Sequence, residues 1–597
     1  MDFNSYFSEV GILHRDLKVG VVSSVNASGV KVNLAHSGNT SGAYLSGSRY
    51  GRGEVGELLL IEGQQSIVLG KLIDVSLPDR DRTELTQDFD GIKSLDSIGY
   101  VQLLGSIDVN SLKLQAGISY YPRLGDRVYS APSEFIASLP KLLNSGVDSK
   151  EDLICLNLGE ATGGVGSKVS VTPEKLFGRH CAILGSTGGG KSWTTTKIVE
   201  ECLRFSNAKV IVIDPTGEYR SVVGKFVEHC HLGSPINLST GSMEVSIPPE
   251  DFNESDFIAL FEPSGKVQGP KLREAIKSLR LVKLAPSKFP DGYVKKIGQS
   301  QVDYNEAMRL DGNNAKVDDP SLPFDVSMLN KQIVEECYFP GDRPGYWGSK
   351  NGNELTYCSS LFTRILNVTN SAAFKSVFSP SSGACRFGDS LDRFIQGDGR
   401  VFRVCLSDLS YQFGAREVIA NVIGRKLMQK ARALDFMNKP VLVVVDEAHN
   451  FLGKQVGSED HYARLDAFEI IAKEGRKYGL NICLATQRPR DITEGVLSQM
   501  GTLLVHRLTN DKDRDLVERA CGEIDRSAAA FLPNLKQGEV VLVGVDFPIP
   551  MTIQMDKPQN PPMSDGPSFQ DLWRHSSENS GDDAEEQNSS LGDVSFL

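Results

Sequence analysis

The feature that most restricts the fold is a glycine-rich segment that matches the pattern G-x-x-x-x-G-K-[ST]. It consists of Gly185, Ser186, Thr187, Gly188, Gly189, Gly190, Lys191 and Ser192. Backbone N–H groups of such a loop converge on phosphate oxygens, and glycine allows that approach because it has no Cβ. The apolar run 181–184 before it predicts a strand, and residues 193–203 after it predict a helix whose N-terminus faces the phosphates. This context favours an ATP site over an ordinary glycine-rich turn, with Lys191 on the β- and γ-phosphates and Ser192 on Mg²⁺.

The rest of this region alternates apolar runs with helical patterns, which predicts an α/β fold with a parallel sheet covered on both faces. The runs are 181–184, 210–213, 401–406, 441–445, 482–485 and 502–505. We therefore expect a P-loop core formed by residues 166–245 and 396–557. Between its two parts, residues 246–395 have a helical rhythm and predict an insertion subdomain. Pro270 suits the first position of one helix, in which Leu272, Ala275, Ile276 and Leu279 share a face.

Before the core, short β-like runs are separated by glycine and polar residues. They occur at 19–22, 29–34, 58–61, 66–72, 99–104 and 126–129. Many short strands with turn residues between them are typical of a small barrel or sandwich. We expect an assembly or docking domain over residues 1–165. Residues 558–597 are rich in Pro, Ser, Asn, Asp and Glu and predict an acidic flexible tail.

A second motif follows the apolar run 441–445, where Asp446 and Glu447 occupy consecutive positions. A carboxylate at the carboxyl end of a buried strand can hold Mg²⁺ through water, which we expect of Asp446. The next carboxylate, Glu447, can orient or deprotonate an attacking water. A solvated acidic strand end is the alternative, but the pairing with a phosphate loop favours ATP hydrolysis.

Three other positions are candidate site residues. Asp214 begins the segment Asp-Pro-Thr-Gly-Glu-Tyr, in which Asp214 and Glu218 offer an alternative base or a simple capped turn. Gln487 follows the run 482–485 and can sense the γ-phosphate, because an amide both donates and accepts hydrogen bonds. Arg476 is a candidate finger for a neighbouring subunit's nucleotide, and a solvated helix-end cation is its alternative.

Composition excludes several classes. The chain has 64 Lys and Arg residues and 76 Asp and Glu residues, so its net charge is −12. This charge excludes a protein that binds nucleic acid over its whole surface. The ten cysteines form no C-x-x-C pair, which is typical of a reduced protein rather than a disulfide framework. The N-terminus has no signal-peptide pattern, and no apolar stretch reaches the ~18 residues of a membrane span. We expect a cytoplasmic protein with no membrane partner.

Taken together, these segments resemble those of the HerA-type hexameric ATPases, which are related to the FtsK translocases. The similar segments are 176–192, 214–219, 445–449, 474–479 and 485–489, and they occur in the family's order. The resemblance implies that the P-loop core is RecA-like and that the chain forms a homo-hexamer with ATP sites between subunits. It also implies an N-terminal HAS-type barrel and double-stranded DNA in the central pore. It implies Arg476 as the finger acting in trans. It also implies a separately encoded effector, either a nuclease or a sirtuin-like NADase, which acts in DNA end processing or in bacterial anti-phage defence. The large helical insertion and the acidic tail favour the defence setting.

Two rival functions remain open at this stage. An ATP-binding ring scaffold that assembles and regulates an effector is the first, because the acidic net charge disfavours passage of DNA. A protein-unfolding motor is the second. ATP hydrolysis stimulated by duplex DNA would favour the translocase, and stimulation by unfolded polypeptide would favour the unfolding motor.

Overall fold

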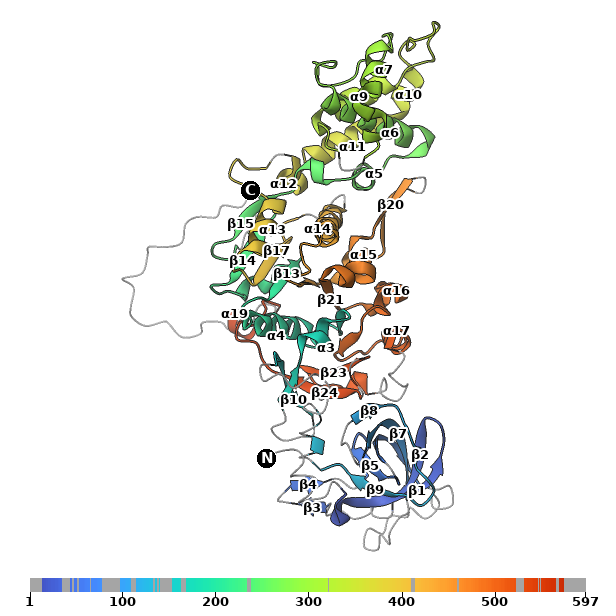
Figure 1. The fold of residues 1–597 in the computed structure, drawn as a ribbon, viewed down its shortest axis with the longest axis vertical. Coiled ribbons are helices and arrows are strands. Elements are labelled where there is room, and N and C mark those ends of the chain that lie inside the picture. The colour runs from blue at the N-terminus through green and yellow to red at the C-terminus, as the bar shows by residue number, and fades with distance from the viewer. Residues whose placement is uncertain are drawn as a thin grey trace, which may run out of the picture.

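The computed structural model describes most of the 597 residues. The described ranges are 13–34, 43–45, 48–50, 53–64, 66–77, 97–108, 114–132, 135–136, 139, 153–162, 168–233, 238–319, 322–378, 380–409, 414–458, 461–521, 531–545, 547, 549–564 and 569–573. They form a barrel at one end of an elongated molecule, a large sheet with helices in the middle, and a group of helices at the other end (Figure 1).

The N-terminal unit is a closed barrel of six strands. Strand order is β2-β1-β9-β5-β6-β7, and pairing between β2 and β7 closes it, with β8 added beside β7. The strands are β1 Lys18–Val25, β2 Gly29–Leu34, β5 Leu58–Glu62, β6 Ser66–Ser76, β7 Ser97–Asp108, β8 Leu114–Ala116 and β9 Arg127–Ser130, beside the small hairpin β3 Ala43–Leu45 and β4 Ser48–Tyr50. Valine and leucine side chains that alternate along the strands fill the interior, as in other small barrels. The predicted barrel is confirmed.

The central unit is a sheet of thirteen strands in the order β11-β10-β24-β23-β22-β12-β21-β18-β13-β17-β14-β15-β16. Strands β22 to β16 run parallel, and the strands on the other side are antiparallel. The bounds are β10 Leu156–Ala161, β11 Lys168–Val171, β12 Cys181–Leu184, β13 Lys209–Asp214, β14 Val227–His231, β15 Met243–Ser246, β16 Cys385–Arg386, β17 Val401–Cys405, β18 Val441–Val445, β21 Leu480–Thr486, β22 Thr502–Val505, β23 Glu539–Gly544 and β24 Met551–Met555. The predicted α/β class is confirmed.

Successive side chains of the parallel strands enter two different cores, because a strand alternates its faces. Ala182 and Leu184 of β12 pack on the side of α14 and α15, whereas Cys181 and Ile183 pack against α4. The helices next to the sheet are α3 Pro173–Phe177, α4 Lys191–Leu203, α13 Phe387–Gln396, α14 Ala415–Arg432, α15 Ala467–Glu474, α16 Glu494–Leu497 and α17 Asp511–Cys521. Burial on both faces explains why the strands appear in the sequence as unbroken apolar runs.

The insertion between β15 and β16 is helical. It holds α5 Glu254–Phe261, α6 Gly265–Leu284, α7 Val302–Arg309, α8 Asn313–Lys316, α9 Leu329–Glu336, α10 Gly352–Tyr357, α11 Ser359–Thr369 and α12 Lys375–Phe378. Helix α6 buries the face predicted for it, which consists of Leu272, Ala275, Ile276 and Leu279. Pro270, however, lies inside α6 rather than at its first position. The first turn is held by Gln268, whose amide donates to the carbonyl of Tyr357 and to Ser360 at 2.7 and 2.9 Å.

Three predicted boundaries differ from the structure. Strands β10 and β11 belong to the large sheet, which therefore begins before residue 166. Strand β16 and α13 return to the sheet before residue 396, and Phe394 of α13 stacks on Phe402 with ring centroids 5.2 Å apart. The predicted tail begins with residues that contact the core, and it includes the short helix α19 Phe569–Leu572. Residues 565–568 and 574–597 of the predicted tail lie outside the described residues.

Candidate functional site

The glycine-rich segment connects β12 to α4 at the carboxyl end of the parallel sheet. Gly188 and Gly190 have φ angles of +75° and +108°, which other residues rarely adopt. A Cβ on Gly185 would lie 2.6 Å from the Cβ of His506, so that position has no room for a side chain. Helix α4 starts at Lys191, and its N-terminal dipole therefore points into the loop, as a phosphate site requires.

Lys191 is the centre of an acidic cluster. Its Nζ lies 2.8 Å from Oδ1 of Asp446 and 2.8 Å from Oε1 of Glu447, and the Lys191 side chain is only 4% exposed. Burial by itself lowers the pKa of a lysine, but the two carboxylates outweigh it and raise the pKa of Lys191. Lys191 therefore stays positively charged, and a phosphate group can take the place of its two carboxylate partners.

Glu447 follows β18 in a left-handed conformation, with φ at +45°. Such a conformation costs a residue other than glycine roughly 1–3 kcal/mol and is tolerated where the surroundings fix it. Here the Nε2 of Gln487 donates to Oε1 of Glu447 at 2.7 Å, and the Oε1 of Gln487 accepts from the Thr187 hydroxyl at 2.6 Å. His449 lies 3.3 Å from the other oxygen of Glu447. A chain of contacts thus joins the phosphate loop to the carboxylate expected to act as base.

Asp214 lies at the end of β13 and is completely buried. Its carboxylate accepts from the backbone N–H groups of Gly217, Glu218 and Tyr219 at 2.7, 3.2 and 3.1 Å, and from Nε of Arg403 at 2.7 Å. Both oxygens are thereby occupied. The geometry makes Asp214 the residue that holds its turn in place, which is the capped-turn alternative of the sequence, and it gives Asp214 no direct contact with a reacting group.

Arg476 lies at the opposite end of the sheet. It belongs to η10 Gly475–Tyr478, which precedes β21, whereas Gln487 follows β21. Seven residues of strand separate the two positions by roughly 20 Å, at about 3.3 Å per residue. Arg476 lines a cavity of about 480 Å³ together with Arg179, Lys473 and Lys477. Arg476 therefore cannot reach the nucleotide of its own subunit.

Mg²⁺ and ATP fit the residues around Lys191. The Oδ2 atom of Asp446 and the Oε2 atom of Glu218 are buried side-chain oxygens without a hydrogen-bond partner, which a cation could satisfy. Among the described residues, no three His, Cys, Asp or Glu side chains gather as a metal site. Mg²⁺ in nucleotide sites needs fewer protein ligands, because one or two carboxylates act together with the phosphates.

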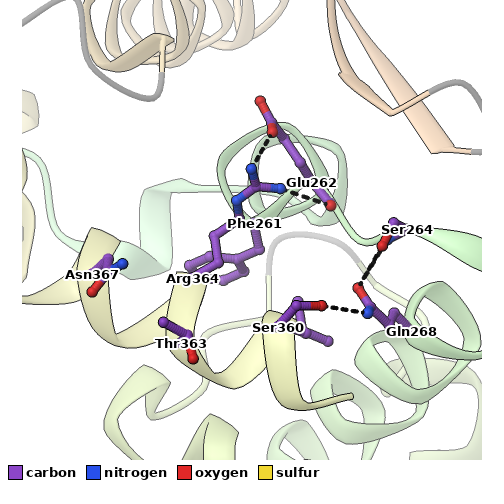
Figure 2. A pocket seen from close by; sticks show the side chains of 9 residues that line it. Phe261, Glu262, Ser264, Gln268, Ser360, Thr363, Arg364 and Asn367 are labelled. Atoms are coloured by element: carbon purple, nitrogen blue, oxygen red, sulfur yellow. Dashed lines mark hydrogen bonds and ion pairs between the residues drawn. The ribbon is translucent and has the colours of Figure 1, made fainter. Parts of the chain in front are cut away.

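A second polar cavity, of about 540 Å³, lies in the insertion between α5, α6 and α11. Figure 2 shows that its charged groups bind one another: Arg364 contacts the carboxylate of Glu262 at 2.8 Å and its carbonyl oxygen at 3.1 Å. The side chain of Gln268 likewise forms hydrogen bonds with Ser264 and Ser360. The phosphate loop and the acidic pair are not among the residues that line this cavity.

Sequence reasoning did not identify two residues of the nucleotide region. His506 follows β22 and lies against the glycines of the loop, and burial lowers its pKa to about 4. Arg403 in β17 fixes Asp214. A polar residue in or directly after a buried strand was the available signal, but it does not indicate which neighbour the side chain will contact.

The fold and this site define a P-loop ATP hydrolase. The family model described as "Helicase HerA, central domain" matches residues 156–317. A probable helicase of Methanocaldococcus jannaschii is 23% identical over 76% of this chain and 78% of its own length. The DNA double-strand break repair helicase HerA of Sulfurisphaera tokodaii is 25% identical over 69% of this chain and 72% of its own length. Residues 156–317 thus match the central domain of the HerA helicases, and the chain is similar to HerA-type helicases over most of its length.

Among solved structures, the VirB4 protein of Thermoanaerobacter pseudethanolicus is similar with a TM-score of 0.45 and 15% identity, over 68% of this chain and 97% of that one. In the part of the chain that the structure describes, no helix is long and apolar enough to cross a membrane.

Proposed function

We propose that this chain is one subunit of a hexameric motor that uses ATP hydrolysis to translocate or unwind double-stranded DNA. The contact of Lys191 with both Asp446 and Glu447 carries the proposal, because it brings the phosphate cation, a metal carboxylate and a base together in one buried cluster. The relatives named as helicases, and as a DNA double-strand break repair helicase, support DNA as the substrate.

The residues divide the reaction among them. Loop N–H groups and Lys191 bind the phosphates, and the cation exchanges its carboxylate contacts for phosphate oxygens. This releases Glu447 to accept a proton from water, while Gln487 orients that water from a position fixed by Thr187. Ser192 and Asp446 would hold Mg²⁺, which neutralises phosphate charge when it is bound.

The ring supplies the remaining cation in this proposal. Arg476 and Arg179 line one cavity at the amino ends of the strands, away from their own phosphate loop. A head-to-tail ring would place this cavity against the nucleotide of the next subunit, where an arginine stabilises the charge of the transition state. The six-fold state, the DNA pore and the partner effector, a nuclease or a sirtuin-like NADase, are parts of this proposal.

The proposal is tested by the rate of ATP hydrolysis with and without duplex DNA. We expect hydrolysis that duplex DNA stimulates and that Lys191→Ala abolishes. Hydrolysis that duplex DNA leaves unchanged, but unfolded polypeptide raises, would contradict a DNA motor.

A ring scaffold that chiefly regulates its effector is the second candidate. The net charge of −12 favours it, because six copies multiply a negative charge that DNA must pass. Glu447→Gln separates the two: a scaffold keeps partner assembly and partner activity, whereas a translocase loses its function while ATP binding persists.

A further inference from the structure

The segment after β24 is tied to the helix of the phosphate loop. We call residues 556–563 the strap. Backbone N–H groups of Gln559 and Asn560 donate to the carboxylate of Glu200 at 2.8 and 2.7 Å, and the Asn560 amide donates to it at 3.0 Å. Glu200 lies in α4, the helix that begins at Lys191. One carboxylate thus fixes the strap to the helix that presents Lys191.

The other end of the strap contacts the turn after β13. The hydroxyl of Ser221 donates to the carbonyl of Pro561 at 2.7 Å, and the N–H of Met563 donates to the carbonyl of Glu218 at 2.9 Å. Both Ser221 and Glu218 belong to η3 Glu218–Ser221. The strap therefore bridges α4 and η3, two elements that the sheet alone does not join.

The side chain of Glu218 interacts with Ser192 and Asp446 of the nucleotide site. Its Oε2 atom is buried without a hydrogen-bond partner, as is Oδ2 of Asp446. Burial and the neighbouring carboxylate of Asp446 raise the pKa of Glu218, whereas a hydrogen bond with Ser192 opposes that rise. Two neighbouring carboxylates with covered oxygens repel each other unless a cation lies between or beside them.

We infer that Glu218 is a second carboxylate at the Mg²⁺ side of the nucleotide site and that the strap positions it. The inference rests on the proposed function, because it assumes that nucleotide and metal bind around Lys191. Asp214 holds the turn from inside through three N–H groups, and the strap holds it from outside through the Glu218 carbonyl. With its backbone fixed on both sides, Glu218 can contact the ion or its water shell at a reduced ordering cost, because only the side chain remains to be ordered.

The test measures metal binding without turnover. Full-length protein is loaded with ADP, and Mn²⁺ in place of Mg²⁺ is titrated by electron paramagnetic resonance of the free ion. Glu218→Gln keeps the size of the side chain and removes its charge, and we expect Mn²⁺ affinity to fall about 10-fold, as for other residues that support a metal site. Glu218→Asp, which retains the charge on a shorter side chain, should fall less. ADP affinity without metal should stay unchanged in both.

The strap is tested by Glu200→Ala, with Glu494→Ala as the control because Glu494 is an exposed glutamate on α16, away from the strap. We expect Glu200→Ala to lower Mn²⁺ affinity several-fold and Glu494→Ala to leave it unchanged. The double variant of Glu200→Ala and Glu218→Gln should bind Mn²⁺ no more weakly than Glu218→Gln alone, because the strap acts through Glu218.

The outcomes separate this inference from the proposed function. If the wild-type chain does not bind ADP, or Lys191→Ala binds it equally well, the nucleotide site itself is wrong. If ADP binds and Asp446→Asn loses Mn²⁺ but Glu218→Gln does not, only the role of Glu218 is wrong. Additive losses in the double variant would overturn the positioning role of the strap.

Discussion

The two ends of the parallel sheet differ in what they hold. At the carboxyl ends, the phosphate loop, Asp446, Glu447 and Gln487 form a closed network around Lys191. At the amino ends, Arg179, Lys473, Arg476 and Lys477 surround an open cavity. The carboxyl ends hold one cation, Lys191, placed for an anionic ligand, whereas the amino ends hold four cations that the ligand of the same subunit cannot reach. Such opposite ends are complementary in a head-to-tail ring but would not be in an isolated subunit.

The largest effect on ATP hydrolysis should come from a substitution at the carboxyl ends of the strands, in the network around Lys191. Glu447→Gln keeps the side-chain size and one oxygen for Lys191 but cannot accept the proton, so we expect the rate of ATP hydrolysis to fall about 10³-fold. ATP affinity should change little, because Lys191 and the loop remain. Single-turnover hydrolysis and nucleotide binding measure the two quantities separately. Hydrolysis within a factor of three of wild type would show that another group is the base.

The cavity at the amino ends of the strands should contribute nearly as much to the rate of ATP hydrolysis. It should do so only for the nucleotide of the neighbouring subunit. Arg476→Ala alone should lower the rate of hydrolysis by about 10³-fold, which is the lower range for arginine fingers. A mixture with Lys191→Ala should regain part of the lost rate, because some interfaces then combine an intact loop with an intact Arg476. Lys477→Ala, the adjacent cation, is the control and should keep its rate.

No recovery in the mixture would contradict a shared site, provided that the two variants exchange subunits. Exchange can be followed by energy transfer between labelled subunits.

The same contrast shows what a sequence can predict. The strands at 181–184, 441–445 and 502–505 were predicted to the residue, because burial on both faces leaves an unbroken apolar run. The loop of residues 185–192 and the pair Asp446 and Glu447 could be proposed because neighbours in the sequence form them.

Contacts between distant segments could not be predicted in this way. The sequence offers Asp214 as an alternative base, but Arg403 from another strand occupies its carboxylate. The sequence predicts Pro270 at the start of a helix, but α6 begins one turn earlier, where Gln268 donates a hydrogen bond to Ser360 of α11. Residues 558–563 of the strap fall within the predicted flexible tail because their composition is polar, whereas their docking depends on Glu200, more than 350 positions away.

A smaller effect is expected from the link between Thr187 and Gln487. Gln487→Ala should lower kcat about 10-fold with little change in KM, since Gln487 positions water and the base rather than the nucleotide. Thr187→Val removes the hydroxyl that holds Gln487 and should have a similar but weaker effect. In the double variant the losses should not add, with a coupling energy of about 1 kcal/mol. Fully additive losses would show that the hydrogen bond between them has no catalytic role.

The smallest effect concerns pH, and it compares a histidine at each end of the sheet. Burial lowers the pKa of His506 beneath the phosphate loop to about 4, and burial together with Arg476 lowers that of His180 to about 4. Both values lie below the ordinary 6.5, so the unfolded chain takes up the protons first. The contribution of these two histidines to the free energy of unfolding is therefore complete above pH 6.5, and it is lost as the pH drops towards 4.

Replacing either histidine by glutamine should reduce this loss by up to about 1.4 kcal/mol between pH 6.5 and 5.5, measured by chemical denaturation at both values. Saturating ADP should diminish the contribution of His506, because nearby phosphates favour its protonated form. In a monomeric sample ADP should leave the contribution of His180 unchanged, since no neighbour then brings a phosphate to that end. An equal response of both histidines to ADP in monomers would contradict the separation of the two ends.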